Sequence, residues 1–306
     1  YRYAEDLNES LTNIRIVTGH STEQMAKFAQ EANAAAKALS TTTTKYTNAA
    51  LIFYQQGLAD DLVKEYTDIT IDMANVTGDG AEQVSSYMTA IWNNFNKSGE
   101  ESAEHFADVL TALGAATASS TSEIAAGLEK FAAIADVTGL SYDYATAALA
   151  TLVSNTRQSA DVVGTSLKTI FSRLESVSLG ETLDDGVNLT KYSEALKVVG
   201  VEILDTSGEM RNLDDILDDT AEKWDTLTRA QQLATAQTVA GVRQYNNFIS
   251  LMDNWDDMKA NLDIAKNSDG TLQEQAGIYA DSWEAARDRV RAAAETIYQS
   301  LLDDKF

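Results

Sequence analysis

The chain of 306 residues contains no proline, and this absence restricts its fold more than any other feature. Average composition would place about fifteen prolines in a chain of this length. Proline breaks helix interiors and interrupts β-ladders, so its absence favours a helical chain without a proline-rich linker. Residues that favour helices, such as alanine, leucine and glutamate, are abundant. We therefore predict an all-α fold, either a multi-helix bundle or a solenoid-like stack of short helices.

Apolar residues recur at helical spacing in several windows, which predicts amphipathic helices. Four such stripes are Phe106, Val109, Leu110 and Leu113; Ile124, Leu128, Phe131 and Ala135; Val162, Leu167, Ile170, Phe171 and Leu174; and Leu213, Ile216, Leu217, Trp224 and Leu227. Capping boxes that predict helix starts are Ser21 with Gln24, Ser98 with Glu101, Ser120 with Glu123, Thr228 with Gln231, and Thr271 with Glu274. Glycines that indicate helix ends are Gly19, Gly57, Gly78, Gly139 and Gly180.

The tripeptide Val-Thr-Gly occurs three times, ending at Gly19, Gly78 and Gly139. Each copy predicts a helix end followed by a new helix. Two interpretations stay open: a repeated unit of stacked helices, or the chance recurrence of a favourable turn.

One stretch departs from the helical pattern. Residues 198–211 are rich in β-branched residues around the turn sequence Asp205 to Gly208, and they predict a small β-hairpin. A lone hairpin is marginal in water, so it must pack on the helices. Its side chains form either an interaction surface or a cover for one end of the helical core. The candidate interaction residues are Val201, Ile203, Glu209, Met210 and Arg211.

We divide the chain into three parts: an N-terminal helical region (1–102), a core helical domain that carries the hairpin (103–265), and a C-terminal segment (266–306). The threonine run 41–44 predicts a helix break between Ser40 and Lys45, because β-branched residues are poor in helix interiors. The last segment predicts a polar amphipathic helix, the possible start of an extended helix. Its apolar residues are Ile278, Trp283, Val290, Ile297 and Leu301. The chain begins at Tyr1 rather than Met, so we expect it to be a piece of a longer polypeptide.

Composition argues against several kinds of chemistry. The chain has no cysteine and only two histidines; we expect His20 to be exposed and His105 to be a partly buried structural residue. We therefore predict no metal site, no cofactor and no catalytic residues. A net charge of −24 disfavours nucleic-acid binding, and no apolar run approaches the length of a membrane span. Adjacent acid pairs could serve glycoside hydrolysis, but they arise freely among 47 acidic residues. These pairs are Asp60–Asp61, Asp184–Asp185, Asp214–Asp215, Asp218–Asp219 and Asp256–Asp257.

An ordered series of segments resembles the core region of bacteriophage and prophage tail tape measure proteins. The series includes FADVL from Phe106, SSTSEI from Ser119, GLSYD from Gly139, VGTSLKTIFSRL from Val163, the hairpin and helix from Gly200 to Leu217, and AGVRQ from Ala240. Together they cover about residues 103–265. No single segment is diagnostic, and Val163 stands where that family often has alanine.

The resemblance implies a structural protein of the virion tail that is not an enzyme. It implies roles in tail assembly, tail-length determination and genome ejection, with several copies in the tube lumen or at the tip. The implied partners are the tail tube protein, distal tail or baseplate proteins and tail assembly chaperones. Other interpretations stay open: a peptidoglycan-acting or membrane-interacting tail module, or a bacterial helical interaction domain.

Overall fold

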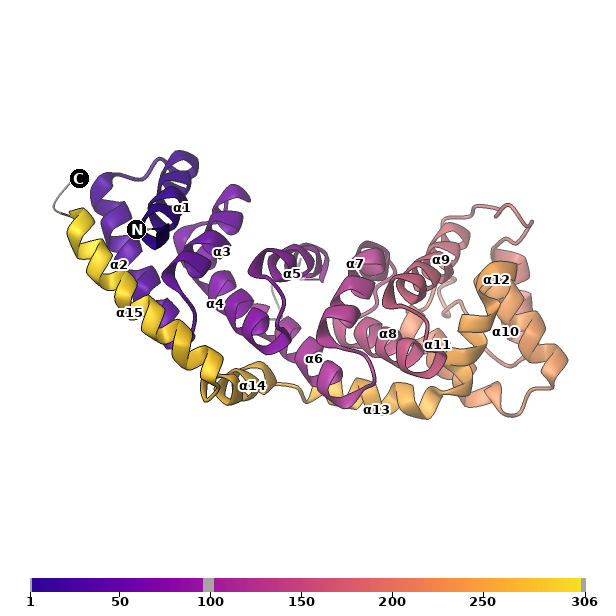
Figure 1. Cartoon of the computed structure of the whole chain (residues 1–306). Helices are drawn as coiled ribbons and strands as arrows, with labels where there is room; N and C mark the ends of the chain where they lie inside the picture. The colour runs from indigo at the N-terminus through magenta and orange to yellow at the C-terminus, as the bar shows by residue number, and fades with distance from the viewer. Residues whose placement is uncertain (1, 96–101, 304–306) are drawn as a thin grey trace. The chain divides into compact units, whose positions relative to one another are not determined.

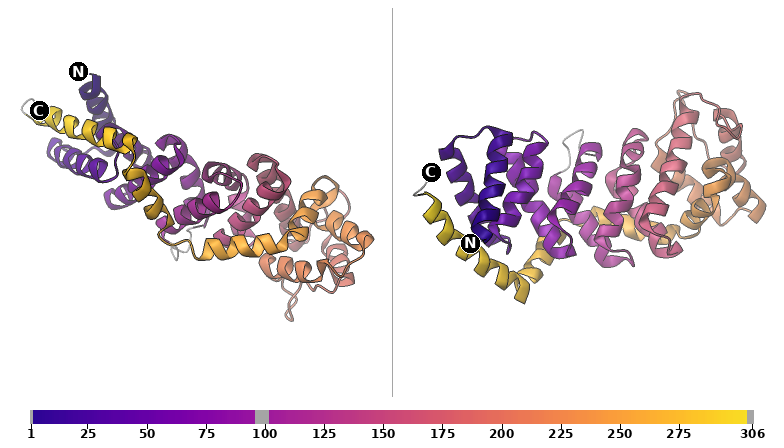
Figure 2. Two further views of the ribbon diagram at one scale, coloured as in Figure 1. Left: turned by 60° about the horizontal axis from the view of Figure 1, so that its bottom comes forward. Right: turned by 45° about the horizontal axis from the view of Figure 1, so that its top comes forward.

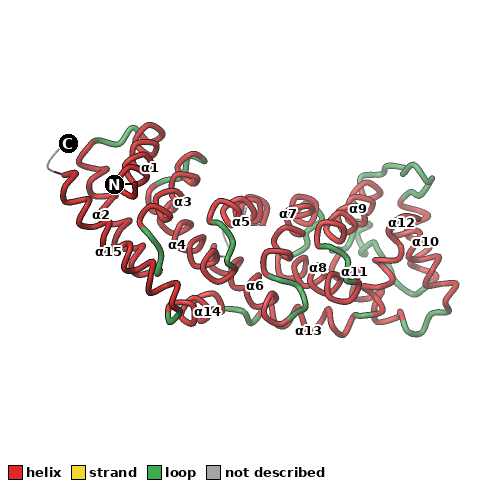
Figure 3. The backbone as a smooth tube through the Cα atoms, viewed as in Figure 1, coloured by secondary structure: helices red, strands yellow, loops and turns green. Residues whose placement is uncertain are grey.

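The computed structural model describes residues 2–95 and 102–303, and these residues form helices joined by loops (Figures 1 and 3). The first eight helices are α1 (Arg2–Thr18), α2 (Thr22–Ala38), α3 (Thr43–Gln55), α4 (Asp60–Thr77), α5 (Ala81–Phe95), α6 (Ala103–Ala116), α7 (Thr121–Val137) and α8 (Tyr142–Thr156). The next seven are α9 (Ala160–Ser178), α10 (Leu189–Val198), α11 (Leu213–Trp224), α12 (Arg229–Asp253), α13 (Trp255–Lys266), α14 (Thr271–Ala280) and α15 (Trp283–Asp303). The described part of the chain contains no β-strand, which confirms the all-α prediction.

The chain divides into two compact units. Unit 1 comprises Tyr1–Thr89, Ser102–Ala107 and Gly270–Phe306, and unit 2 comprises Ala90–Glu101 and Asp108–Asp269. The two ends of the chain therefore belong to the same unit. The three-part division based on sequence stays a prediction.

Unit 1 is built around α3, which packs against α1, α2 and α4. Part of its core consists of Ala32, Ala36, Tyr46, Ala49 and Ile71, where small alanines let the helices approach closely. The C-terminal helix α15 packs on α2, and the views in Figure 2 show the two helices side by side. The last helix of the chain therefore packs against helices from its N-terminal end.

The centre of unit 2 is α8, which contacts α7, α9, α12 and α13. Nearly every residue between Tyr142 and Val153 is buried, as expected of a helix surrounded by others. Beside it α7 crosses α9, where the rings of Phe131 and Phe171 meet edge to face with centroids 5.8 Å apart. The four predicted apolar stripes line the core, except that Val162 is 53% exposed and Leu227 is half-buried.

Local helix signals are largely confirmed. Capping boxes form at Ser21, Ser120 and Thr228. The box predicted at Thr271 is wrong, because Gly270 occupies the N-cap position and Thr271 is already helical. The box predicted at Ser98 lies outside the described residues. All five glycines predicted to end helices adopt positive φ, and the predicted break falls between Ala38 and Thr43.

The three Val-Thr-Gly segments each end a helix, at α1, α4 and α7. The hydroxyls of Thr18, Thr77 and Thr138 donate to the carbonyl four residues earlier, in Ile14, Met73 and Ile134 respectively. The following glycine takes a left-handed conformation. The recurrence is therefore a shared way of ending a helix.

The predicted β-hairpin is wrong. A turn does form at Asp205–Gly208, but the only pairing beyond it is an isolated antiparallel bridge between Leu204 and Met210. Val198 is the last residue of α10, and the amide of Val201 donates to the carbonyl of Leu196 at 2.9 Å. The first flank is thus used to terminate a helix, which leaves too few free backbone groups for a two-stranded ladder.

The predicted apolar face of the C-terminal segment is also wrong. Helix α15 follows a separate helix, α14, and it buries Ala285, Asp288, Ala292 and Glu295. Three of the predicted apolar residues point to solvent: Ile278, Trp283 and Val290 are 70%, 86% and 70% exposed. The side chains of Ile297 and Leu301 lie outside the described residues. Polar groups at the start of α3 stabilise the buried carboxylates: Lys45 pairs with Asp288, and Thr43 and Thr44 donate to Glu295.

Candidate interaction sites

The loop between α10 and α11 carries the residues predicted to form an interaction surface. Val201 and Ile203 are 1% and 0% exposed, so they anchor the loop in the helical core. Glu209 is exposed, and Met210 and Arg211 are half-buried. The surface that the loop offers to a partner is therefore its distal half, next to the Asp205 turn.

The turn at the loop tip is tightly bonded. One carboxylate oxygen of Asp205 accepts hydrogen bonds from the Ser207 hydroxyl (2.6 Å) and from the amides of Ser207 (2.8 Å) and Glu209 (3.0 Å). These bonds, the Ser207 hydroxyl foremost, lower the pKa of Asp205 below its ordinary value. Gly208 takes the positive φ that closes the turn.

Arg211 ties the same loop to α11. Its guanidinium donates to the carbonyl oxygen of Glu202 at 2.6 Å and lies 2.7 Å from a carboxylate oxygen of Asp219. The loop is therefore held at its base by apolar burial, at its tip by the Asp205 turn and along its side by Arg211. A surface fixed in this way can dock a partner without being ordered first.

A second site in unit 2 joins two segments that are far apart in sequence. Helix α12 is interrupted at Gly241, whose φ of 75° and ψ of 165° are not helical. Arg173 of α9 donates to the carbonyl oxygens of Thr238 (3.0 Å) and Val239 (3.3 Å), which the interruption frees. Asp185 neutralises the guanidinium at 2.8 Å. Arg173, which is 14% exposed, thus caps the first half of α12.

Sequence reasoning singled out the segments that contain Arg173 and Gly241 separately but missed their contact. The signal was an arginine between Phe171 and Leu174, on a helix whose neighbouring positions are apolar. A buried guanidinium needs acceptors. The order of residues along the chain does not say which carbonyls supply them.

The adjacent acid pairs have structural roles. Four of them contribute hydrogen bonds or ion pairs: Tyr54 to Asp60, Arg173 to Asp185, Tyr144 to Asp218 with Arg211 to Asp219, and Asn155 to Asp257. Asp214 and Asp215 lie in the first turn of α11, where carboxylates stabilise the helix dipole. The described residues contain no cluster of three acidic or histidine side chains suited to a metal ion. None of the described helices is both long and apolar enough to cross a bilayer.

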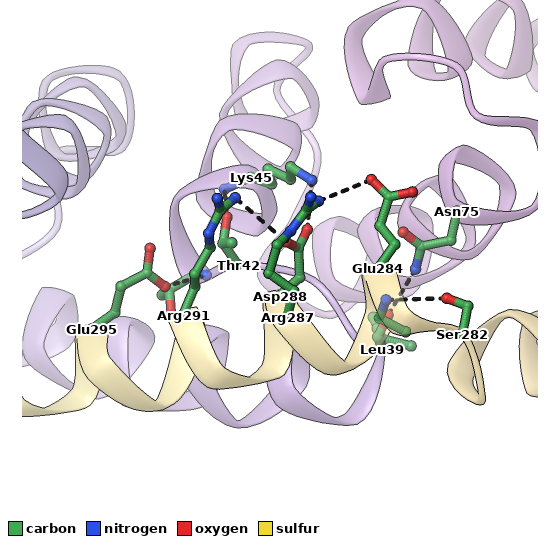
Figure 4. Close-up of polar contacts among 12 residues, drawn as sticks. Leu39, Thr42, Lys45, Asn75, Ser282, Glu284, Arg287, Asp288, Arg291 and Glu295 are labelled. Carbon is green, nitrogen blue, oxygen red and sulfur yellow. Dashed lines mark hydrogen bonds and ion pairs between the residues drawn. The ribbon is translucent and has the colours of Figure 1, made fainter.

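In unit 1, α15 is held by the polar contacts of two buried carboxylates, Asp288 and Glu295, which we call the polar clasp (Figure 4). Sequence reasoning also missed these contacts. Asp288, whose side chain is 1% exposed, pairs with Lys45 at 2.8 Å, Arg287 at 3.3 Å and Arg291 at 3.5 Å. Although burial opposes ionisation, Lys45 and Arg287 lower the pKa of Asp288. The carboxylate is therefore charged and paired in the folded chain.

Glu295 forms the second half of the clasp. Its carboxylate accepts from the amide of Thr43 at 2.6 Å and from the hydroxyl of Thr44 at 3.2 Å, at the start of α3. The amide group of Asn33 on α2 donates to the Thr43 hydroxyl (2.7 Å) and to the carbonyl of Ala292 (3.0 Å). Two residues of the threonine run, Thr43 and Thr44, thus supply the hydrogen-bond donors for Glu295.

The two histidines lie in unit 1. The His20 side chain is only 19% exposed, so the prediction that it is exposed is wrong. Its ring packs edge to face on Tyr54, and its Nε2 lies 3.6 Å from Asp60. His105 is half-buried beside Phe106 on α6, as predicted.

The chain matches a known protein family over most of its length. A family described as phage-related minor tail protein matches residues 31–241. The matched range contains the loop between α10 and α11 and both partners of the Arg173–Gly241 contact. No solved structure matches the chain.

Proposed function

The chain belongs to the phage-related minor tail protein family, and from that premise we propose that it is a compact segment of a tail tape measure protein. A member of this family is a structural component of the phage tail. The family match over residues 31–241 carries the tail assignment. The finer assignment rests on the ordered resemblance between Ala103 and about residue 265.

We propose that the segment acts as an assembly anchor rather than as a passive length element. A length element works through its extension, at about 1.5 Å per helical residue. Here the helices are short and pack into two compact units, and α15 returns to α2. Compact packing suits a docking role. The parent protein would then determine tail length through other, extended parts.

The proposed location is the tube lumen or the tip of the virion tail, with release during genome ejection. The proposed partners are the tail tube protein, distal tail or baseplate proteins and assembly chaperones, with several copies of the chain in each tail. We assign the segment no catalytic role, no cofactor and no sequence-specific nucleic-acid binding. Its net charge of −24 would repel DNA that slides past it.

The docking surface that we propose is the distal half of the loop between α10 and α11, with Glu209, Met210 and Arg211. The support is its rigid base, in which Val201 and Ile203 are buried, together with the exposure of its tip. Replacing Glu209 and Met210 with alanine should reduce tail assembly without unfolding the chain. Tail yield, counted by electron microscopy, would measure the effect.

The decisive experiment deletes residues 108–269, the larger part of unit 2, from the parent gene and joins the ends with a short flexible linker. The retained residues on either side of the deletion, Ala107 and Gly270, both lie in unit 1. As an anchor, the segment is required to start the tube, so we expect no tails or tails of uncontrolled length. Electron microscopy of lysates gives the length distribution.

Two other outcomes contradict parts of the proposal. Tails of uniform length that are shorter by about 240 Å would identify a continuous helical length element, at about 1.5 Å per residue. Normal tails with normal infectivity would overturn the role of unit 2 in tail assembly. A deletion of equal length in a predicted extended part of the parent serves as the control, since it should only shorten the tail.

A further inference from the structure

Helices α2, α3 and α4 belong to unit 1, and a cavity of about 240 Å³ is lined by residues of these three helices and by His20. Its wall is aromatic. Tyr46 and Tyr54 line it and are 3% and 6% exposed, and both His20 and Phe28 meet the Tyr54 ring edge to face at 5.9 and 5.8 Å. The size suits a side-chain head group rather than a large ligand.

Two polar atoms at this cavity have no hydrogen-bond partner. Thr67 is fully buried, and its hydroxyl is unpaired. The Nδ1 atom of His20 is also buried and unpaired. Buried polar atoms are almost always satisfied, because an unmade hydrogen bond leaves the desolvation cost uncompensated. Both residues line the cavity, which places the two unpaired groups next to any ligand bound there.

Both unpaired atoms can act as acceptors. The carboxylate of Asp60 lies beside the other ring nitrogen of His20, Nε2, at 3.6 Å. When the ring proton is on Nε2, facing this carboxylate, Nδ1 carries a lone pair. The Thr67 hydroxyl also has free lone pairs. A ligand that donates hydrogen bonds can therefore satisfy both atoms.

The charge around the cavity is negative. Three carboxylates line it, those of Glu31, Asp60 and Asp61. The two lysines that line it are already engaged: Lys27 pairs with Glu31 at 3.5 Å, and Lys64 pairs with Asp68, which lies outside the lining, at 2.6 Å. Neither Asp60 nor Asp61 pairs with a lysine or arginine among the described residues.

Two tyrosines that line the cavity, Tyr54 and Tyr46, have raised pKa values. Burial, reinforced by the charge of Asp60 and by a hydrogen bond to it, raises the pKa of Tyr54 well above its ordinary value. Burial and the nearby Asp68 do the same to Tyr46. Both hydroxyls stay protonated and donate to these carboxylates, at 3.1 Å from Tyr54 and 2.7 Å from Tyr46.

We propose that this cavity binds the guanidinium group of an arginine side chain presented by a protein partner. Guanidinium carries a positive charge, five N–H donors and no acceptor, and its plane stacks on aromatic rings. A guanidinium group can donate to the two unpaired atoms, pair with carboxylates that have no lysine or arginine partner among the described residues, and stack on the aromatic wall. A metal ion fits less well, because the described residues offer no cluster of three acidic or histidine ligands. That the partner is another tail protein rests on the proposed function.

The test titrates the whole chain with N-acetyl-arginine amide and follows binding by NMR or calorimetry. N-acetyl-citrulline amide is the matched probe, since it has nearly the same shape but no charge. We expect saturable binding of the arginine probe that is at least about tenfold tighter than that of the citrulline probe. Equal binding of the two probes, or none, would overturn the cation site.

Variants locate the binding. Asp60→Asn should weaken binding of the arginine probe at least about fivefold, because it removes the charge at the cavity. Asp256→Asn is the matched control: Asp256 is also exposed in the first turn of a helix, but it lies in unit 2. Thr67→Val should weaken binding, whereas Thr67→Ser, which keeps the hydroxyl, should retain it even if the valine variant folds poorly. Unchanged binding in Asp60→Asn would contradict the proposal.

The source of the guanidinium is tested separately. If a protein partner supplies it, an Asp60→Asn phage should assemble fewer tails than an Asp256→Asn phage. Normal assembly by Asp60→Asn, together with probe binding by the parent chain, would overturn the protein partner and point to a free alkylguanidinium. A negative titration overturns the cation site alone. Normal tails after deletion of residues 108–269 overturn the role of unit 2 in tail assembly alone, because the cavity lies in unit 1.

Discussion

Gly164 lies where α9 crosses α7, and no other residue fits this position. A Cβ atom on Gly164 would stand 2.3 Å from the carbonyl oxygen of Gly127, a backbone atom that cannot move aside on its own. A Cβ on Gly127 would likewise stand 2.8 Å from a methyl group of Leu149. The two glycines let the helices approach closely.

We therefore expect Gly164→Ala to destabilise the chain by about 2–4 kcal/mol, because α9 must move away from α7. Chemical denaturation measures the change. Gly277→Ala is the control, since Gly277 is also helical but has open space around its Cβ position. Alanine there should be neutral or slightly stabilising, by up to about 1 kcal/mol. An equal effect of the two substitutions would mean that helix propensity, not the crossing, governs both sites.

Asp72 makes the stability of unit 1 depend on pH. Burial, reinforced by the charges of Asp68 and Glu104, raises the pKa of Asp72 from 3.8 to about 7. Between these two values the folded chain binds more protons than the unfolded chain. The contribution of Asp72 to stability is therefore present below about pH 4 and is lost as the pH rises through 7.

Replacing Asp72 with asparagine should remove this dependence. We expect Asp72→Asn to be more stable than the parent by about 1–3 kcal/mol at pH 8, with little difference near pH 4. Denaturation curves at the two pH values measure the change. The exposed Asp256→Asn variant controls for net charge. A variant that gains nothing at pH 8 would show that Asp72 is solvated in the folded chain.

At the scale of single elements, α15 shows how polar groups can decide which face of a helix is buried. Its clasp positions Glu295 at the start of α3, where the carboxylate accepts from a helix N-terminal amide. Glu295→Ala should cost about 1–2 kcal/mol, the usual effect of losing a helix cap. It should also speed hydrogen exchange in the first turn of α3. Glu284→Ala removes only an exposed ion pair on the same helix and should change stability by less than about 0.5 kcal/mol.

At the scale of the whole molecule, the two units are built from different parts of the chain. Unit 1 needs its C-terminal helices: α14 buries Leu272, and α15 buries Ala285, Ala292 and two carboxylates. Unit 2 is continuous from Asp108 to Asp269 apart from the short segment 90–101. Its core therefore depends on none of the residues after Asp269.

Truncating the chain after Asp269 tests this difference. We expect amides of α2 and α3 to exchange at least about tenfold faster, because Asn33 and the Thr43 amide lose their partners. Amides of α7, α8 and α9 should keep their protection. Hydrogen exchange followed by mass spectrometry reports both units in one experiment. Equal loss of protection in both units would show that they unfold as one cooperative body.

The amino-acid sequence by itself determined the local features of this protein. The lack of proline and the apolar periodicity predicted the helices, while Ser21, Ser120, Thr228 and the terminal glycines marked many of their ends. These signals work because a helix cap involves residues only three or four positions apart. The ordered segments after Ala103 likewise indicated a phage tail protein.

Only the tertiary structure decided which distant residues meet. It turned a predicted hairpin into a loop, because α10 extends to Val198 and the backbone of Val201 is used to end that helix. It buried Asp288 and Glu295 rather than Trp283 and Val290, because α3 offered the Lys45 ammonium group and the Thr43 amide. It also brought Arg173 to the interruption at Gly241. In each case a polar or apolar partner far along the chain changed the free energy of burial, and local spacing carries no information about that partner.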